Sequence, residues 1–140
     1  MSTSLIALIL FALWGLLLVA SVGIWRGAML ATGKMKAGTI TSGAPHGPDA
    51  YWRLNRAHMN VMENLPVFAA LVLVGVGRVA NASEFDTLAS VVIAARIVQS
   101  LIHISSGTAG AIRLRFAAYL VQWACFVWMG WRILQAGGVL

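Results

Sequence analysis

The sequence predicts an all-α integral membrane protein, a bundle of four transmembrane helices that forms a single domain over residues 1–140. Of the 140 residues, 60% are hydrophobic and only 10% are charged, and the mean hydropathy is +0.84. Soluble globular domains are about a quarter charged, so this composition excludes them. The apolar residues also gather into long runs, and a helix needs roughly 20 such residues to cross a bilayer. The chain therefore has room for three or four spans and for no separate soluble domain.

The first two helices flank the longest loop. The first span is expected at about residues 5–26, an apolar run that ends at an interfacial Trp25-Arg26 pair. A stretch rich in glycine and small polar residues follows it. The second helix is expected at about 50–78, with Asp49 as its N-cap. Pro66 lies inside this helix and removes one backbone donor, which predicts a kink just beyond Glu63.

The last two helices complete the bundle. After a short acidic connection at 81–86, the third span is expected at about residues 87–105. It carries four polar side chains on one face, at spacings of three and four: Arg96, Gln99, Ser100 and His103. A turn of serine, glycine and threonine leads into the fourth span at about 112–135, which ends before a pair of glycines.

Basic residues predict the orientation of the bundle, because Lys and Arg concentrate on the cytoplasmic side of membrane proteins. The first loop with its flanks and the third connection together hold Arg26, Lys34, Lys36, Arg53, Arg56, Arg113 and Arg115. The opposite side has only Arg78 and Arg132. Both loops are therefore expected in the cytoplasm and both termini on the non-cytoplasmic side of an inner or plasma membrane.

Several classes of function are disfavoured. The net charge of +6 does not indicate a nucleic-acid partner, because Lys and Arg are scattered singly between apolar stretches. Cys125 is the only cysteine, so one chain cannot form a disulfide or a cysteine metal site. The three histidines, His46, His58 and His103, lack metal-binding spacing, and no metal site is expected.

A polar stripe in the second helix is the most informative feature of the chain. Arg56, Asn60 and Glu63 are four and three residues apart, so a cation, an amide and a carboxylate project the same way. Ionisable groups at membrane depth are costly unless they face protein, a partner or water. A structural Arg–Glu pair between helices is one interpretation. An excess of cations near this level over the single embedded acid favours a bound anionic ligand, and those cations are Arg26, Arg56, Arg96, Arg113 and Arg115.

Arginines of the third and fourth helices extend this polar region. Arg113 and Arg115 begin the fourth helix, and Tyr119 follows one turn after Arg115. Anchoring at the membrane interface is one interpretation of the two arginines. The other is that a guanidinium here lowers the pKa of a ligand thiol or holds a developing negative charge. Arg96 lies too deep in its span to reach either interface easily, so it is expected to face the bundle interior.

The run from Arg56 to Pro66, RAHMNVMENLP, resembles the signature of the MAPEG superfamily, the membrane-associated proteins of eicosanoid and glutathione metabolism. The resemblance lies in the Arg-Ala pair at Arg56, followed by Asn60 four residues later, Glu63 three residues after that and Pro66 three residues further on. The pattern Arg96-x-x-Gln99-x-x-x-His103 is similar to the family's next motif. The likeness covers nearly the whole chain and suggests a bacterial-type member.

This resemblance implies a homotrimer with glutathione bound between subunits near the cytosolic side. It also implies a transferase or peroxidase activity toward lipophilic electrophiles that arrive from the bilayer. Arg56, Asn60 and Glu63 would hold the peptide, Arg26 would reach it from a neighbouring subunit, and Arg113 or Arg115 would stabilise the thiolate. The implied glutathione-binding set is completed by Arg96, Gln99, His103 and Tyr119.

Two other functions remain open from the sequence. A lone intramembrane carboxylate suits a small proton-coupled transporter that uses Glu63. A non-catalytic membrane assembly or lipid-binding module would need none of these polar residues for chemistry.

Overall fold

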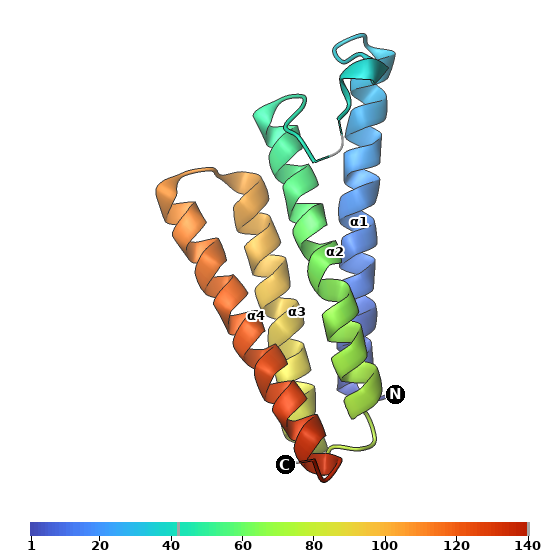
Figure 1. Ribbon diagram of the computed structural model, residues 1–140. Coiled ribbons are helices and arrows are strands. Elements are labelled where there is room, and N and C mark those ends of the chain that lie inside the picture. Colours follow the sequence, from blue (N-terminus) through green and yellow to red (C-terminus); the bar gives the residue numbers. More distant parts are fainter. Residues whose placement is uncertain (42, 140) are drawn as a thin grey trace.

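A computed structural model describes residues 1–41 and 43–139 and confirms the all-helical fold. The helices are α1 (Thr3–Ala31), α2 (Asp49–Gly75), α3 (Ala82–Ser105) and α4 (Ala109–Ala136), with a short 3-10 helix, η1 (Ala37–Thr39), in the first loop (Figure 1). Helices α1, α2 and α3 are long and apolar enough to cross a membrane. At 28 residues, α4 also has the length of a span, and its insertion as the fourth one stays a prediction.

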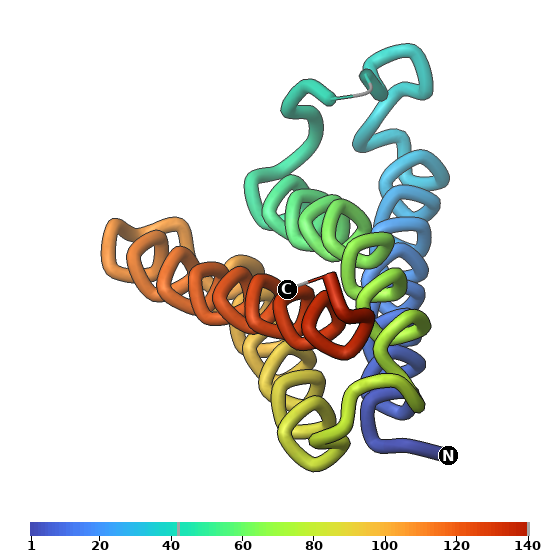
Figure 2. Tube along the Cα trace, turned by 60° about the horizontal axis from the view of Figure 1, so that its bottom comes forward, coloured from blue at the N-terminus to red at the C-terminus, as the bar shows by residue number. Residues whose placement is uncertain are grey.

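The four helices run up and down as two hairpins, so both termini lie at one end of the bundle (Figure 1). The α1–α2 and α3–α4 loops lie at the other end. Helix α1 packs on α2 and α3, and α4 packs chiefly on α3. Toward the two loops α4 leans away from α1 and α2, as both views show (Figures 1 and 2).

The helix bounds differ from the predicted ones where capping decides them. Helix α3 begins at Ala82 rather than at about residue 87, because the Asn81 side chain accepts a hydrogen bond of 3.1 Å from the Glu84 amide. Such an N-cap lets acidic residues continue into the first turn. The N-cap of α2 is Pro48 rather than Asp49, which lies within the first turn. This helix also ends three residues early, at Gly75.

Helix α2 continues through Pro66 without a break in its assignment. The green part of the trace, which belongs to α2, changes direction along its length (Figure 2). The ring of a proline inside a helix clashes with the preceding turn and removes one hydrogen bond, which bends the helix. Pro66 lies three residues after Glu63, so the proline is close to the polar stripe along the chain.

The core is built from aromatic and small residues that let the helices approach closely. Phe68 of α2 lies 5.2 Å from Phe11 and 5.9 Å from Phe126, measured between ring centroids. Gly75 accommodates the ring of Phe85, which would overlap any Cβ atom at that position. Large apolar side chains such as those of Leu13, Leu16, Leu73 and Trp123 remain exposed on the outside. An apolar exterior of this kind suits contact with lipid.

Candidate functional site

A cavity lined mainly by polar residues lies between α2, α3 and α4. Its volume is about 290 Å³. The nine lining residues are Asn60, Glu63 and Asn64 of α2, Arg96 and Gln99 of α3, and Ile112, Arg115, Phe116 and Tyr119 of α4. Each helix contributes a stripe spaced by three or four residues, because side chains at that spacing share one helix face.

Six of the ten predicted site residues therefore line one cavity, although they come from three helices. These six are Asn60, Glu63, Arg96, Gln99, Arg115 and Tyr119. They supply two guanidinium groups, one carboxylate, two amides and a phenol. The set offers hydrogen-bond donors to anions and one acidic acceptor for an ammonium group.

Arg96 is the most deeply buried charged residue at the cavity. Only 1% of its surface is exposed, and its Nε and Nη2 atoms have no hydrogen-bond partner within the described part of the chain. Its guanidinium carbon lies 5.5 Å from the centroid of the Phe11 ring, a cation–π contact with α1. A buried cation with unused donors is costly unless an acceptor joins it. Arg96 therefore favours an anionic group inside the cavity.

Glu63 does not neutralise Arg96 directly. Among the described residues, the only salt bridge joins Arg132 to Glu84, at 3.0 Å and at the terminal end of the bundle. The Glu63 side chain instead lines the cavity and is exposed in the single protomer. A purely structural Arg–Glu pair, one of the two interpretations of the sequence, is thus not formed between these residues.

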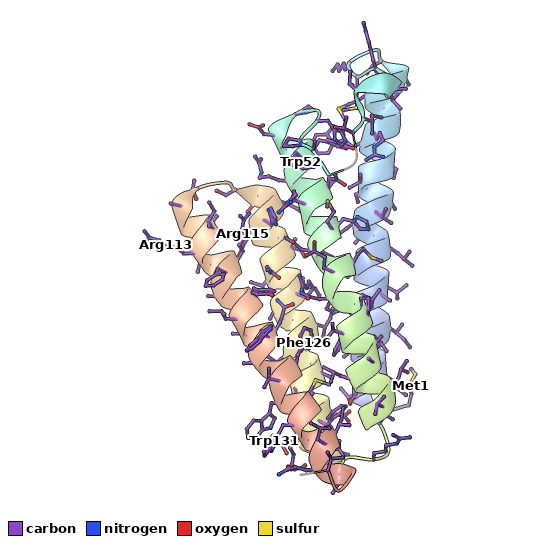
Figure 3. All side chains as sticks on the ribbon, in the orientation of Figure 1. Met1, Trp52, Arg113, Arg115, Phe126 and Trp131 are labelled. Atoms are coloured by element: carbon purple, nitrogen blue, oxygen red, sulfur yellow. The ribbon has the colours of Figure 1, made fainter. Side chains whose placement is uncertain are left out.

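The structure separates the two arginines of α4. Arg115 is half-buried and lines the cavity, whereas Arg113 is exposed and does not. Figure 3 shows Arg115 on the side of α4 that faces α3, and Arg113 directed away from the bundle. Two residues along a helix are about 200° apart around its axis, so one helix cannot present both to the same cavity.

His103 and Arg56 lie outside the cavity lining. His103 is buried, and its Nδ1 is 3.3 Å from the Nδ2 atom of Asn60, so it contacts a lining residue. Arg56 is exposed on α2. Both residues therefore stand at the margin of the site rather than in it.

Arg26 is engaged elsewhere within its own protomer. Its Nε donates a hydrogen bond of 2.8 Å to the hydroxyl of Tyr51, which is fully buried at the start of α2. The ring of His46 in the first loop approaches the same hydroxyl, with Nε2 at 3.3 Å. The resemblance assigns Arg26 to the site of a neighbouring subunit, and that assignment stays a prediction.

Three lining residues were not predicted from the sequence. Asn64 lies four residues after Asn60, so helical spacing alone could have added it to the polar stripe. Ile112 and Phe116 flank Arg115 on its own face of α4. Their apolar side chains carry no signal of a site until the rotation of α4 is known.

A fourth unpredicted residue, Gln122, does not line the cavity but contacts the lining residue Gln99. It is fully buried, and its Nε2 donates to the Oε1 of Gln99 at 3.0 Å and to the backbone oxygen of Ala118 at 2.9 Å. A glutamine within an apolar stretch of α4 could have been marked from the sequence as a polar residue at membrane depth.

The described residues contain no cluster of three or more metal-ligating side chains. The cavity is instead arranged for a ligand that carries both signs of charge. Arg96 and Arg115 suit carboxylate or thiolate groups, Glu63 suits an ammonium group, and the amides suit peptide groups. The apolar Ile112 and Phe116 also line the cavity, and both are exposed.

The chain is similar to a known protein family. The model of the MAPEG family matches residues 4–135, nearly the whole chain. No curated protein and no solved structure matches it.

Proposed function

Because this chain belongs to the MAPEG family, which includes glutathione transferases and peroxidases, we propose that it is a glutathione-dependent membrane transferase or peroxidase acting on lipophilic electrophiles. The observation that carries the proposal is the cavity in which two arginines, one carboxylate and several amides meet. Neither lipid anchoring nor helix packing requires this combination at membrane depth.

The residues at the cavity fit glutathione in charge and hydrogen bonding. The peptide carries two carboxylates, one ammonium group and two amide bonds. The unused Nε and Nη2 donors of buried Arg96 suit a carboxylate, and Glu63 suits the ammonium group. Asn60 and Gln99 suit the peptide amides. The cavity of about 290 Å³ lies near the lower end of the range for small-molecule sites.

Bound glutathione would supply a thiol nucleophile. The guanidinium of Arg115 would favour the ionised form of that thiol by charge attraction and would hold it in place through a charge-assisted hydrogen bond. The hydroxyl of Tyr119, one turn along the same face of α4, offers a further donor. Ile112 and Phe116 beside Arg115 give a lipophilic electrophile an apolar approach from the bilayer.

Completion of the site by a neighbouring subunit is part of the proposal. Glu63 and Arg56 are exposed in one protomer, although an ionisable residue in a membrane helix should face protein or water. A homotrimer would cover them and would bring Arg26 of a neighbour toward the ligand. The lipid partner is the surrounding bilayer, and we propose that all four helices span it with both termini on the non-cytoplasmic side.

The proposal is tested by glutathione binding to the purified protein. Titration calorimetry in detergent should show a saturable site, and the ultraviolet difference spectrum should show a thiolate signal that grows with glutathione. A protein that gives neither signal at saturating glutathione would refute the proposal. Uptake into proteoliposomes that depends on a pH gradient and is lost in Glu63→Gln would instead indicate the transporter.

A further inference from the structure

We propose that Gln122 is a positioning residue that fixes the amide of Gln99 with its nitrogen toward the cavity. This nitrogen then donates a hydrogen bond to a carboxylate or carbonyl oxygen of the ligand. The inference rests on the proposed function and adds to it the polarity of one wall of the site. It concerns a residue that does not line the cavity itself.

The orientation of both amides follows from one fixed acceptor. The backbone oxygen of Ala118 can only accept, so the Gln122 atom that lies 2.9 Å from it must be the nitrogen. That nitrogen also lies 3.0 Å from a side-chain atom of Gln99, which must therefore be the oxygen. A flip of either amide would set two donors or two acceptors against each other. The nitrogen of Gln99 is then the polar atom available to the cavity.

The burial of this pair indicates that it serves the cavity rather than the core. Gln122 is fully buried, and its own Oε1 has no partner among the residues that the structure describes. Leucine of similar size would pack there without an unsatisfied oxygen. Gln99 is 7% exposed and lines the cavity, so the hydrogen bond links a buried residue to the site.

The consequence is a wall of donors on α3. Arg96 and Gln99 are three residues apart, on one helix face, and both line the cavity. The Nε and Nη2 of Arg96 have no partner in the described part of the chain, and the Gln99 nitrogen adds a further donor. Glu63 on α2 presents the only carboxylate among the lining residues. A ligand with both charges is thereby oriented, with an oxyanion toward α3 and an ammonium group toward Glu63.

Selective labelling makes this orientation observable without an activity assay. The chain has three glutamines, Gln99, Gln122 and Gln135, so a ¹⁵N-glutamine sample gives three side-chain amide signals. Addition of glutathione should shift the signal of Gln99. Gln135 serves as an internal control, because it is exposed and its oxygen accepts from Arg132 at 2.9 Å, away from the cavity. Binding that leaves the Gln99 signal unmoved would overturn the inference.

Substitutions then test the role of Gln122 through the glutathione dissociation constant. Gln122→Leu should raise it about fivefold, the loss of roughly one oriented hydrogen bond, and Gln99→Leu should add little in that background. Gln99→Glu keeps an oxygen for Gln122 but replaces the donor by an anion, and it should weaken binding more. Ser100→Ala is the matched control, because Ser100 is buried on α3 and, among the described residues, its hydroxyl donates only to the Arg96 backbone oxygen, at 2.9 Å.

The outcomes separate this inference from the proposed function. A purely structural Gln122 would lower the thermal-unfolding midpoint in Gln122→Leu and leave the dissociation constant of the folded protein unchanged. In that case glutathione binding by the parent protein would still support the proposed function. Failure of the parent protein to bind glutathione would refute both.

Discussion

At the scale of single residues, the contrast between Arg113 and Arg115 gives the sharpest test of the site. Arg115 lines the cavity and Arg113 is exposed outside it. Arg115→Ala should lower the conjugation or peroxidase rate about 10²-fold, the usual effect of removing a group that stabilises developing negative charge. Arg113→Ala should leave the rate within about twofold. An exposed cation at the membrane interface helps to set the topology of the protein but contributes little to the chemistry of the cavity. The measurement is the steady-state rate at saturating glutathione.

One outcome would contradict the assignment of Arg115, rather than Arg113, to the cavity. Equal losses in both variants would indicate that the two arginines act through topology or folding rather than through the cavity. Both purified variants should therefore be compared by thermal unfolding before their rates are interpreted.

Residue-level predictability follows from helical periodicity. Asn60 and Glu63, like Arg96 and Gln99, were paired by spacing within one helix, which needs no tertiary information. The sequence does not decide between Arg113 and Arg115, because that choice depends on the rotation of α4 about its axis. Gln122 was missed because its role exists only through Gln99, a residue 23 positions away on another helix.

At the scale of the elements, α2 and α3 approach closely at one glycine. Gly75 ends α2 against the ring of Phe85, and a methyl group there would overlap the ring. Gly75→Ala should lower the free energy of unfolding by about 1–3 kcal/mol, as other substitutions that overfill a packed core do. Gly23→Ala is the matched control, since nothing lies within 4 Å of that position in α1. There the substitution should be neutral or slightly stabilising.

Thermal unfolding in detergent, followed by circular dichroism, compares the two glycine variants. A midpoint of Gly75→Ala equal to that of the parent protein would show that Phe85 moves aside without strain. The packing between α2 and α3 would then be looser than the structure indicates.

Element bounds were predictable where hydropathy decides them and not where caps decide them. The apolar runs gave four helices in the correct order. The start of α3 was expected too late, because residues 81–86 carry acidic groups that suit a loop as well as a first helical turn. The Asn81 cap resolves that ambiguity through one hydrogen bond.

At the scale of the whole molecule, the arrangement of the ends makes the orientation testable. Both termini lie at one end of the bundle and both basic loops at the other (Figure 1). In a Cys125→Ala background, a membrane-impermeant thiol reagent on intact cells should label Ala136→Cys and not Thr39→Cys. Permeabilised cells should show both labelled. The opposite pattern would invert the proposed topology, and equal labelling in intact cells would contradict a bundle whose termini and first loop lie on opposite sides of the membrane.

The composition of the site across subunits can be tested by mixing two inactive variants. If each site combines Arg115 of one subunit with Arg26 of its neighbour, then Arg26→Ala and Arg115→Ala should each be inactive alone. In randomly mixed trimers, about a quarter of the sites would join an intact Arg115 to an intact neighbouring Arg26, so co-expression should restore about a quarter of the activity. A site built within one protomer gives no recovery, because every subunit then lacks one of its own arginines.

Arg26 donates to Tyr51 inside its protomer, so Tyr51→Phe, which removes that acceptor, is the control for a local structural effect. Recovery of activity in the mixture, with Tyr51→Phe alone remaining active, would establish that a second copy of the chain completes the site.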